Sequence, residues 1–193
     1  MYISRGNRKL EKASRLFLIW NLPAVESCPG ATPMCRRRCY ARKAERLYRG
    51  VLDARKRNMA ATRRPDFVPG IVALIAKTGP RPYFRVHESG DFYSQEYLDA
   101  WFEVARAFPQ TKFLAYTQSF HLDFRERPPN FVIRFSVWPD TDYTKVPCGP
   151  LAFVGNSRHH DPARFDAAVP CRGKCASCLL CWEHPGDVRF KIH

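Results

Sequence analysis

The chain has 193 residues, of which 45% are apolar and 13% aromatic, and a formal net charge of +14 at pH 7. This length suits one full-sized domain, expected here over residues 1–193, and the apolar content excludes an intrinsically disordered chain. A membrane-spanning helix needs roughly 20 consecutive apolar residues. The longest apolar runs, at residues 16–22 and 113–116, are far shorter, so no membrane partner is expected.

Strand and helix patterns alternate along the chain, which predicts a largely parallel sheet with helices packed on it. Strands are expected, in chain order, at residues 16–22, 83–87, 113–116, 131–137, 151–154 and 188–192. Helices are expected at residues 40–48, 52–61 and 67–78, and another begins after Ser94 and ends before Pro109. The expected fold class is α/β, a partial (incomplete) parallel β/α barrel with a cysteine-rich C-terminal segment, residues 148–193, packed on the same domain.

The N-terminus bears on the cellular compartment. Residues 1–10 contain Arg5, Arg8 and Lys9 but no small-residue cleavage site, so no secretory signal is expected. The expected location is therefore cytoplasmic. In a reducing compartment, clustered cysteines are metal ligands more often than disulfides.

Four cysteines lie close together near the C-terminus, with the spacing C-x3-C-x2-C-x2-C at Cys171, Cys175, Cys178 and Cys181. Bacterial ferredoxins hold their clusters with C-x2-C-x2-C-x3-C, which is this spacing in reverse order. A zinc ribbon instead separates two C-x2-C pairs by many residues, and no such gap is present here. The spacing predicts a 4Fe–4S cluster, with a structural zinc ion as the first alternative and unliganded or redox-active thiols as the second.

Three more cysteines, Cys28, Cys35 and Cys39, follow the first strand with the spacing C-x6-C-x3-C. Three thiolates leave a cluster one ligand short of four. The missing ligand is Cys148, Cys171, a substrate or a cofactor, and the sequence leaves these alternatives open. The eight cysteines therefore predict one or two 4Fe–4S clusters.

Several short motifs resemble those of the phage gene product eighty-eight family. They are Cys28-Pro29-Gly30, Cys39-Tyr40-Ala41, Ser89-Gly90-Asp91-Phe92, Ala115-Tyr116-Thr117 and the run from Cys178 through Cys181-Trp182. This resemblance covers most of the chain. It implies a phage-related protein and no particular reaction.

A three-cysteine loop after the first strand of a parallel barrel, followed by Cys39-Tyr40-Ala41, also resembles radical S-adenosylmethionine (SAM) proteins. That resemblance implies a cluster on the three cysteines and SAM bound near Ser89, Gly90 and Asp91. The superfamily spaces its cysteines C-x3-C-x2-C, whereas both gaps are longer here. Its Gly-Gly-Glu, which holds the amino group of SAM, is replaced by Ser89-Gly90-Asp91, whose carboxylate is one methylene shorter.

Polar residues recur just after the predicted strands, at residues 87–91, 117–119, 138–140 and 155–161. Ligands of parallel sheets collect at the carboxyl ends of the strands, so these positions predict one common rim. Glu88 and Asp91 are candidate acids, bases or cation ligands, and His87 is a candidate metal or phosphate ligand. The alternatives are helix capping for Asp91 and a solvated surface for residues 159 and 160.

The positive charge is concentrated in one segment. Residues 36–64 carry twelve Lys or Arg against two acidic residues, a net of +10, whereas residues 1–35 give +3 and residues 65–193 give +1. Local basicity of this kind indicates an anionic partner.

The segment contains aromatic residues only at Tyr40 and Tyr48, so it is not a stacking platform for single strands. It predicts a phosphate-contacting face for nucleic acid, either DNA or RNA. Compensation of thiolate charge and solvation of a helix are the alternatives. The candidate contact residues are Arg36, Arg37, Arg38, Arg42, Lys43, Arg46, Arg49, Arg55, Lys56, Arg57, Arg63 and Arg64.

Three hypotheses of function follow from these features. The first is a radical-SAM-like or otherwise redox-active enzyme that acts on nucleic acid. The second is a DNA- or RNA-binding protein in which the clusters are structural. The third is a nuclease that uses a metal ion at Glu88 and Asp91. The sequence sets no oligomeric state.

Overall fold

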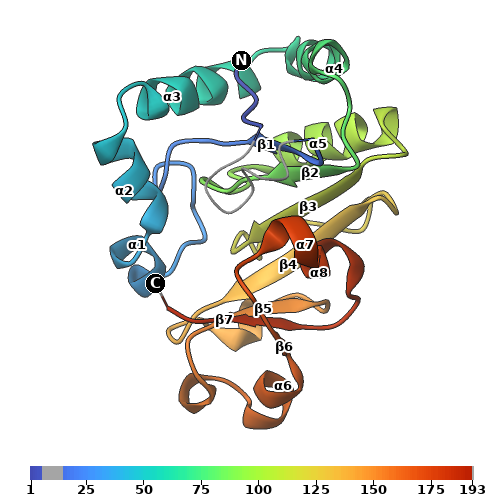
Figure 1. The fold of residues 1–193 in the computed structure, drawn as a ribbon. Coiled ribbons are helices and arrows are strands. Elements are labelled where there is room, and N and C mark those ends of the chain that lie inside the picture. The colour runs from blue at the N-terminus through green and yellow to red at the C-terminus, as the bar shows by residue number, and fades with distance from the viewer. Residues whose placement is uncertain (6–14, 193) are drawn as a thin grey trace.

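The structure is a computed structural model that describes residues 1–5 and 15–192. A seven-stranded parallel sheet runs through it, with strand order β1-β2-β3-β4-β5-β7-β6 (Figure 1). The expected α/β class is thereby confirmed. Residues 6–10 of the segment considered for a signal peptide lie outside the described residues.

The strands are β1 (Phe17–Trp20), β2 (Tyr83–Val86), β3 (Lys112–Thr117), β4 (Phe131–Val137), β5 (Leu151–Val154), β6 (Val169–Pro170) and β7 (Val188–Phe190). The helices are α1 (Pro33–Arg37), α2 (Tyr40–Leu47), α3 (Val51–Thr62), α4 (Phe67–Thr78), α5 (Gln95–Ala107), α6 (Pro162–Ala167), α7 (Cys175–Cys178) and α8 (Leu180–Glu183). Single 3-10 turns, η2 (Tyr143–Lys145) and η3 (Ser157–His159), flank β5. No helix of the described segments has the length and apolarity that crossing a bilayer requires.

One face of the sheet, here called the outer face, packs against α4 and α5. Alternate strand residues such as Trp20 and Phe84 bury their rings there against Trp101 of α5, and the ring of Phe113 stacks on Phe84. Each large apolar side chain buried in this way contributes about 1.5–3 kcal/mol. The side chain of Ser94 caps the first turn of α5 by accepting from the Tyr97 N–H. The apolar residues of α5 share one side of the helix, and this side packs against the sheet.

The opposite, inner face carries a smaller core that is completed from the C-terminus. Phe17 and Leu114 from the strands pack with Trp182 of α8, and the Phe17 and Trp182 ring centroids are 5.1 Å apart. Of the cysteine-rich segment, α7 and α8 therefore lie on the sheet, in front of β3 and β4 in Figure 1, whereas β5, β6 and β7 are strands of the sheet itself. Because all strands are parallel, the loops after β1, β2 and β3 leave from the same edge.

Candidate metal centres

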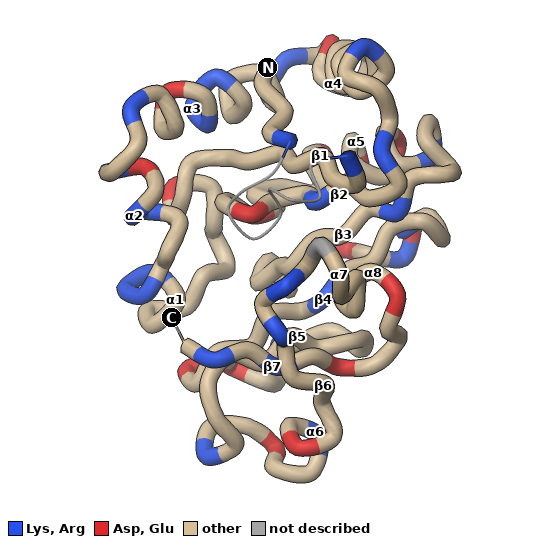
Figure 2. Tube along the Cα trace, in the orientation of Figure 1, with Lys and Arg blue, Asp and Glu red and all other residues tan. Residues whose placement is uncertain are grey.

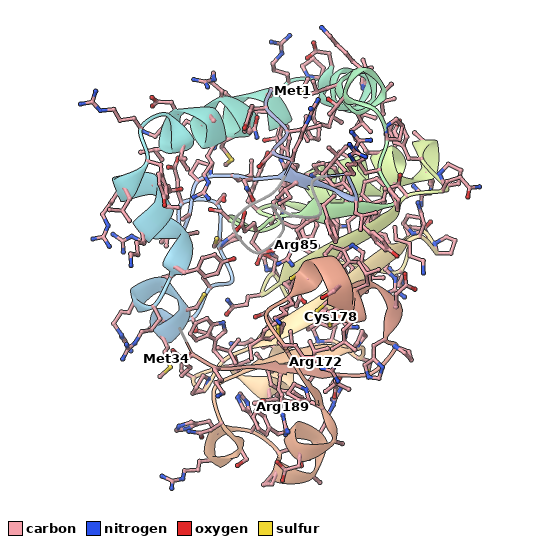
Figure 3. All side chains as sticks on the ribbon, viewed as in Figure 1. Met1, Met34, Arg85, Arg172, Cys178 and Arg189 are labelled. Atoms are coloured by element: carbon pink, nitrogen blue, oxygen red, sulfur yellow. The ribbon has the colours of Figure 1, made fainter. Side chains whose placement is uncertain are left out.

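The four C-terminal cysteines line one small cavity on the inner face. Cys171 follows β6, Cys175 and Cys178 begin and end α7, and Cys181 lies on α8. Leu179 separates the two short helices with a positive φ of 50°, which turns the chain so that the thiols on both helices line the same cavity. We call these four cysteines the C-site. Figure 3 shows Cys178 on the side of the sheet that also bears Arg85.

Arg134 of β4 anchors the C-site to the sheet. Its side chain is fully buried, and it donates to the carbonyl oxygens of Cys181 (3.0 Å), His184 and Gly186 (2.6 Å). A buried guanidinium must have its N–H groups satisfied. These three carbonyls satisfy it and at the same time hold the segment that carries Cys181 against the sheet.

Hydrogen-bond donors reach two sulfur atoms of the C-site, those of Cys181 and Cys171. Burial raises the pKa of the Cys181 thiol, while the Tyr116 hydroxyl that donates to its sulfur and the charges of Arg85 and Arg134 lower it. The Gly173 N–H donates to the sulfur of Cys171 at 3.4 Å. Donors and positive charge of this kind stabilise a thiolate, which is the metal-binding form of cysteine.

Cys28, Cys35 and Cys39 come together at the carboxyl edge of β1, and we call them the N-site. Burial raises the pKa of Cys28 to about 12, and the negative charges of Asp91, Cys35 and Cys39 raise it further. Burial also raises the pKa of Cys35 to about 11, against a hydrogen bond from Gln118 to its sulfur that lowers it. The three thiols and one carboxylate therefore influence each other across a common, largely desolvated space.

The loop that bears the N-site is joined to the ends of β2 and β3. Asn21 Oδ1 accepts from the backbone N–H groups of Glu88 (2.8 Å) and Ser89 (2.9 Å). Gly30 lies so close to the end of β3 that an added Cβ would be 2.0 Å from the Gln118 carbonyl oxygen. Only glycine permits this approach.

Asp91 is buried and joins the ends of two strands. Its Oδ1 accepts from the Phe92 N–H (2.7 Å) and its Oδ2 from the Gln118 N–H (2.8 Å), and burial raises its pKa to about 6. Ser94 is the N-cap of α5, so the expected alternative of helix capping by Asp91 is wrong. The neighbouring Gly90 has a φ of +92°, which brings the backbone against Leu22 and is accessible at low cost only to glycine.

His87, Glu88 and Asp91, which were expected to act together at the end of β2, lie in different surroundings. The His87 ring lies in the outer core, where Nε2 contacts the Tyr97 hydroxyl at 2.9 Å and burial lowers its pKa to about 3. Glu88 is half-buried on the N-site side, and its carbonyl accepts from Tyr40 at 2.6 Å. Although 52% of Tyr40 is exposed, its hydroxyl is covered, and burial raises the pKa of Tyr40 to about 12.

Two further predicted positions are placed apart from the thiol sites. Cys148 is exposed and precedes β5, so it lies at the amino end of that strand, whereas the N-site follows the carboxyl end of β1. The solvated surface expected for His160 is wrong, because this side chain is buried and its ring stacks on Phe165.

Among residues 1–5 and 15–192, no three His, Cys, Asp or Glu side chains form a group that could hold a single metal ion. Thiolates around one zinc ion crowd together because each Zn–S bond is about 2.3 Å long. A 4Fe–4S cluster takes one thiolate on each iron, so its ligands stand farther apart. The C-site consists of four thiols around one cavity, with hydrogen-bond donors to the sulfur atoms of Cys171 and Cys181.

The predicted phosphate contacts lie on α1, α2 and α3 and in the turns that follow them (Figure 2), and most of their side chains are exposed. Two are not available. Arg36 donates to the carbonyls of Ala31 (3.0 Å) and Cys28 (2.9 Å), and the buried Arg55 pairs with Glu45 at 2.9 Å. The exposed members, here called the basic face, are Arg37, Arg38, Arg42, Lys43, Arg46, Arg49, Lys56, Arg57, Arg63 and Arg64.

Sequence reasoning missed the residues that support the thiol sites. Arg85 of β2 lies with its guanidinium 4.1 Å from the centre of the Tyr116 ring, and its charge reaches both Cys181 and Tyr40. Arg134 of β4 was missed as well. The available signal was an arginine in the middle of an otherwise apolar strand, which requires an internal partner once the strand is buried.

The fold and the sites together define the chain as a parallel α/β protein with two groups of thiols, one at the edge of the sheet and one on its inner face. The family model described as Gene product 88 matches residues 1–184, and the chain belongs to this family. The resemblance to the phage family is thus confirmed.

Two relatives are the Gene 88 proteins of Mycobacterium phages D29 and L5. Each is 30% identical to this chain, over 197 and 195 residues respectively, and each match covers 85% of this chain and 81% of the relative. No solved structure matches the chain. The wider resemblance to radical SAM proteins finds no support in these matches.

Proposed function

We propose that the protein is an iron–sulfur protein that carries one 4Fe–4S cluster at each thiol site and binds nucleic acid on its basic face. The observation that carries this proposal is the convergence of the four C-site cysteines on one cavity. Cys171 joins this group from outside the two short helices, so the convergence depends on the sheet as well as on the local spacing. Zinc remains the alternative metal for this donor set.

The two sites have different roles in this proposal. The C-site supplies four thiols and is complete, so it is the structural or electron-carrying site. The N-site supplies three, which leaves one position for a substrate or cofactor. Cys148 lies at the amino end of β5 and Cys171 belongs to the C-site, which favours an external ligand there. The N-site is therefore the reactive one.

The enzymatic form of the proposal is a radical-SAM-like reaction in a partial barrel. Strands β1 to β5 neighbour each other in chain order, as in β/α barrels, and the N-site follows the first of them. Of the candidate cofactor-binding residues Ser89, Gly90 and Asp91, the carboxylate of Asp91 lies close enough to the N-site to raise the pKa of Cys28. A cluster on Cys28, Cys35 and Cys39 would pass an electron from an external reductant to bound SAM, while Ser89, Gly90 and Asp91 would position the SAM.

The non-enzymatic form is favoured by one observation. Both carboxylate oxygens of Asp91 accept backbone N–H groups, a pattern that fits a residue joining strand ends. In this form the clusters are structural and the cytoplasmic protein acts through its basic face. The nuclease hypothesis gains nothing from the geometry, because these bonds direct Asp91 toward the backbone.

Anaerobic purification tests the iron–sulfur proposal. We expect iron and acid-labile sulfide, with broad absorption that is lost on oxidation. Cys178→Ala should remove the C-site share of both elements, and Cys35→Ala the N-site share. Stoichiometric zinc without sulfide would overturn the proposal. Binding of SAM with reductive cleavage then separates the enzymatic form from the structural one.

A further inference from the structure

A cleft of about 430 Å³ opens where the turn between α3 and α4 meets the start of α5. Its walls include Thr62, Arg63, Val68, Tyr93 and Ala100, and none of the cysteines lines it. The volume lies within the roughly 300–1,000 Å³ of small-molecule sites. The cleft is therefore large enough to accept a planar heterocycle and is separate from both thiol sites.

Tyr93 forms a fixed aromatic wall of this cleft. Its ring stacks on the buried ring of Tyr97, with centroids 4.8 Å apart and an interplanar angle of 13°. Its hydroxyl also shares a 2.8 Å hydrogen bond with the Thr62 hydroxyl. An aromatic surface held at both ends is ordered before a ligand arrives, so binding loses little conformational freedom.

The cleft lies at the end of the basic face. Arg63, the C-cap of α3, lies beside the cleft, is exposed, and forms no ion pair within the described part of the chain, whereas Arg64 pairs with Asp66 at 2.7 Å. Lys56 and Arg57 on α3 are likewise exposed. A strand whose phosphates lie along α3 would thus bring its next base to the cleft.

We propose that this cleft takes an unpaired nucleobase of a single strand bound on the basic face, stacked against Tyr93. The cleft supplies the aromatic surface that the basic segment itself lacks. A base in a duplex is already stacked and paired, so it enters only after unstacking, which costs a few kcal/mol. The site therefore selects single strands, and the selectivity comes from the cleft while the affinity for phosphate comes from α3. This inference rests on the proposed nucleic-acid binding.

The test uses the full-length, cluster-loaded protein with a fluorescent single strand and its duplex at fixed salt concentration. Wild type should bind the single strand more tightly, and Tyr93→Ala should weaken that binding about 10-fold, within the range of one lost base stack. Tyr93→Phe keeps the ring and should bind within about 2-fold of wild type. Duplex affinity and the salt dependence should stay unchanged in both variants.

A second variant guards against misfolding. Ala100→Phe fills the cleft from α5 and should cause the same selective loss with Tyr93 intact, while the melting temperature and iron content report the fold. Equal affinity for single strand and duplex, or an unchanged single-strand affinity of Tyr93→Ala, overturns this inference but leaves the proposed nucleic-acid binding intact. If the wild-type protein binds neither the single strand nor the duplex at low salt, both the inference and the proposed nucleic-acid partner are overturned.

Discussion

At the residue scale, two buried titratable groups near the end of β2 act on stability in opposite directions. Burial lowers the pKa of His87 to about 3 from 6.5, so its contribution is present above pH 6.5 and is lost as the pH falls toward 3. Burial raises the pKa of Asp91 to about 6 from 3.8, so its contribution is present below pH 3.8 and is lost as the pH rises through 6. The two effects oppose each other between these limits.

Removal of either group should leave the pH dependence of stability that the other group causes. His87→Gln should make the protein gain stability as the pH falls from about 6 to 4, because only Asp91 then takes up a proton on folding. Asp91→Asn should make the protein lose stability over the same pH range, because only His87 then releases a proton on folding. Urea unfolding at pH 6 and pH 4 measures both slopes, each bounded by about 1.4 kcal/mol per pH unit. Identical slopes in wild type and both variants would contradict the assignment.

Gly30 gives a second prediction at this scale. Gly30→Ala places a Cβ 2.0 Å from the Gln118 carbonyl oxygen, and backbone cannot move aside cheaply. We expect the N-site loop to detach from the sheet, with loss of the N-site iron and retention of the C-site iron.

Gly79→Ala is the matched control, because that glycine has open space around it and only a positive φ of 88°. It should cost about 1–3 kcal/mol without loss of iron. Full iron content in Gly30→Ala would show that the loop adjusts.

At the element scale, α3 carries the test of the basic face. Reversal of Lys56, Arg57 and Arg63 to Glu should lower affinity for nucleic acid and flatten its salt dependence, because each phosphate contact releases about one counterion. The iron content should not change. Arg55 is left intact because its charge supports the fold through Glu45.

The control reverses three exposed cations elsewhere, namely Lys77, Arg127 and Arg158, which gives the same change in total charge. Fluorescence anisotropy over a salt series compares the two triple variants. An equal loss in both would indicate a general charge effect and not a site.

A second prediction at this scale concerns β4 and α8. Arg134→Met removes the donor to three carbonyl oxygens and should destabilise the protein by at least about 3 kcal/mol, since bonds to a charged group contribute about 1.5–3 kcal/mol each. Denaturant unfolding and iron content measure the effect, which should fall on the C-site. Arg85→Met, which loses one hydrogen bond, should cost less stability. Equal losses would contradict the anchoring role of Arg134.

The elements that were predicted well are those whose pattern is set locally. The strand at Phe131–Val137 was predicted with both ends correct, because apolar residues fill it and turn residues bound it. The helix after Ser94 was found from its cap and its apolar face. By contrast, α7 and α8 are four residues each, too short for a helical period, and their packing depends on the distant Phe17 and Arg134.

At the scale of the whole molecule, the cysteine spacing indicated two thiol groups, but their surroundings are not local in the sequence. Arg85 and Tyr116 come from β2 and β3, and they reach Cys181 only because parallel pairing places both strands under α8. The base-sized cleft likewise joins the end of α3 to α5. Spacing within a segment predicts ligands, whereas the neighbours of those ligands follow from the order of strands.

That order has a consequence for synthesis. β7 is the last strand of the described sheet to be synthesised, yet it lies between β5 and β6 and pairs with both. Until residues 188–190 emerge, β6 lacks its only neighbour in the described sheet, and the four thiols that follow it have no fixed scaffold. The nascent chain can arrange β1 to β5 first, because chains fold from the N-terminus during translation. Assembly of the C-site is therefore expected to follow the synthesis of residues 188–190, and a product cut short after Cys181 should retain all eight cysteines but fail to assemble that site.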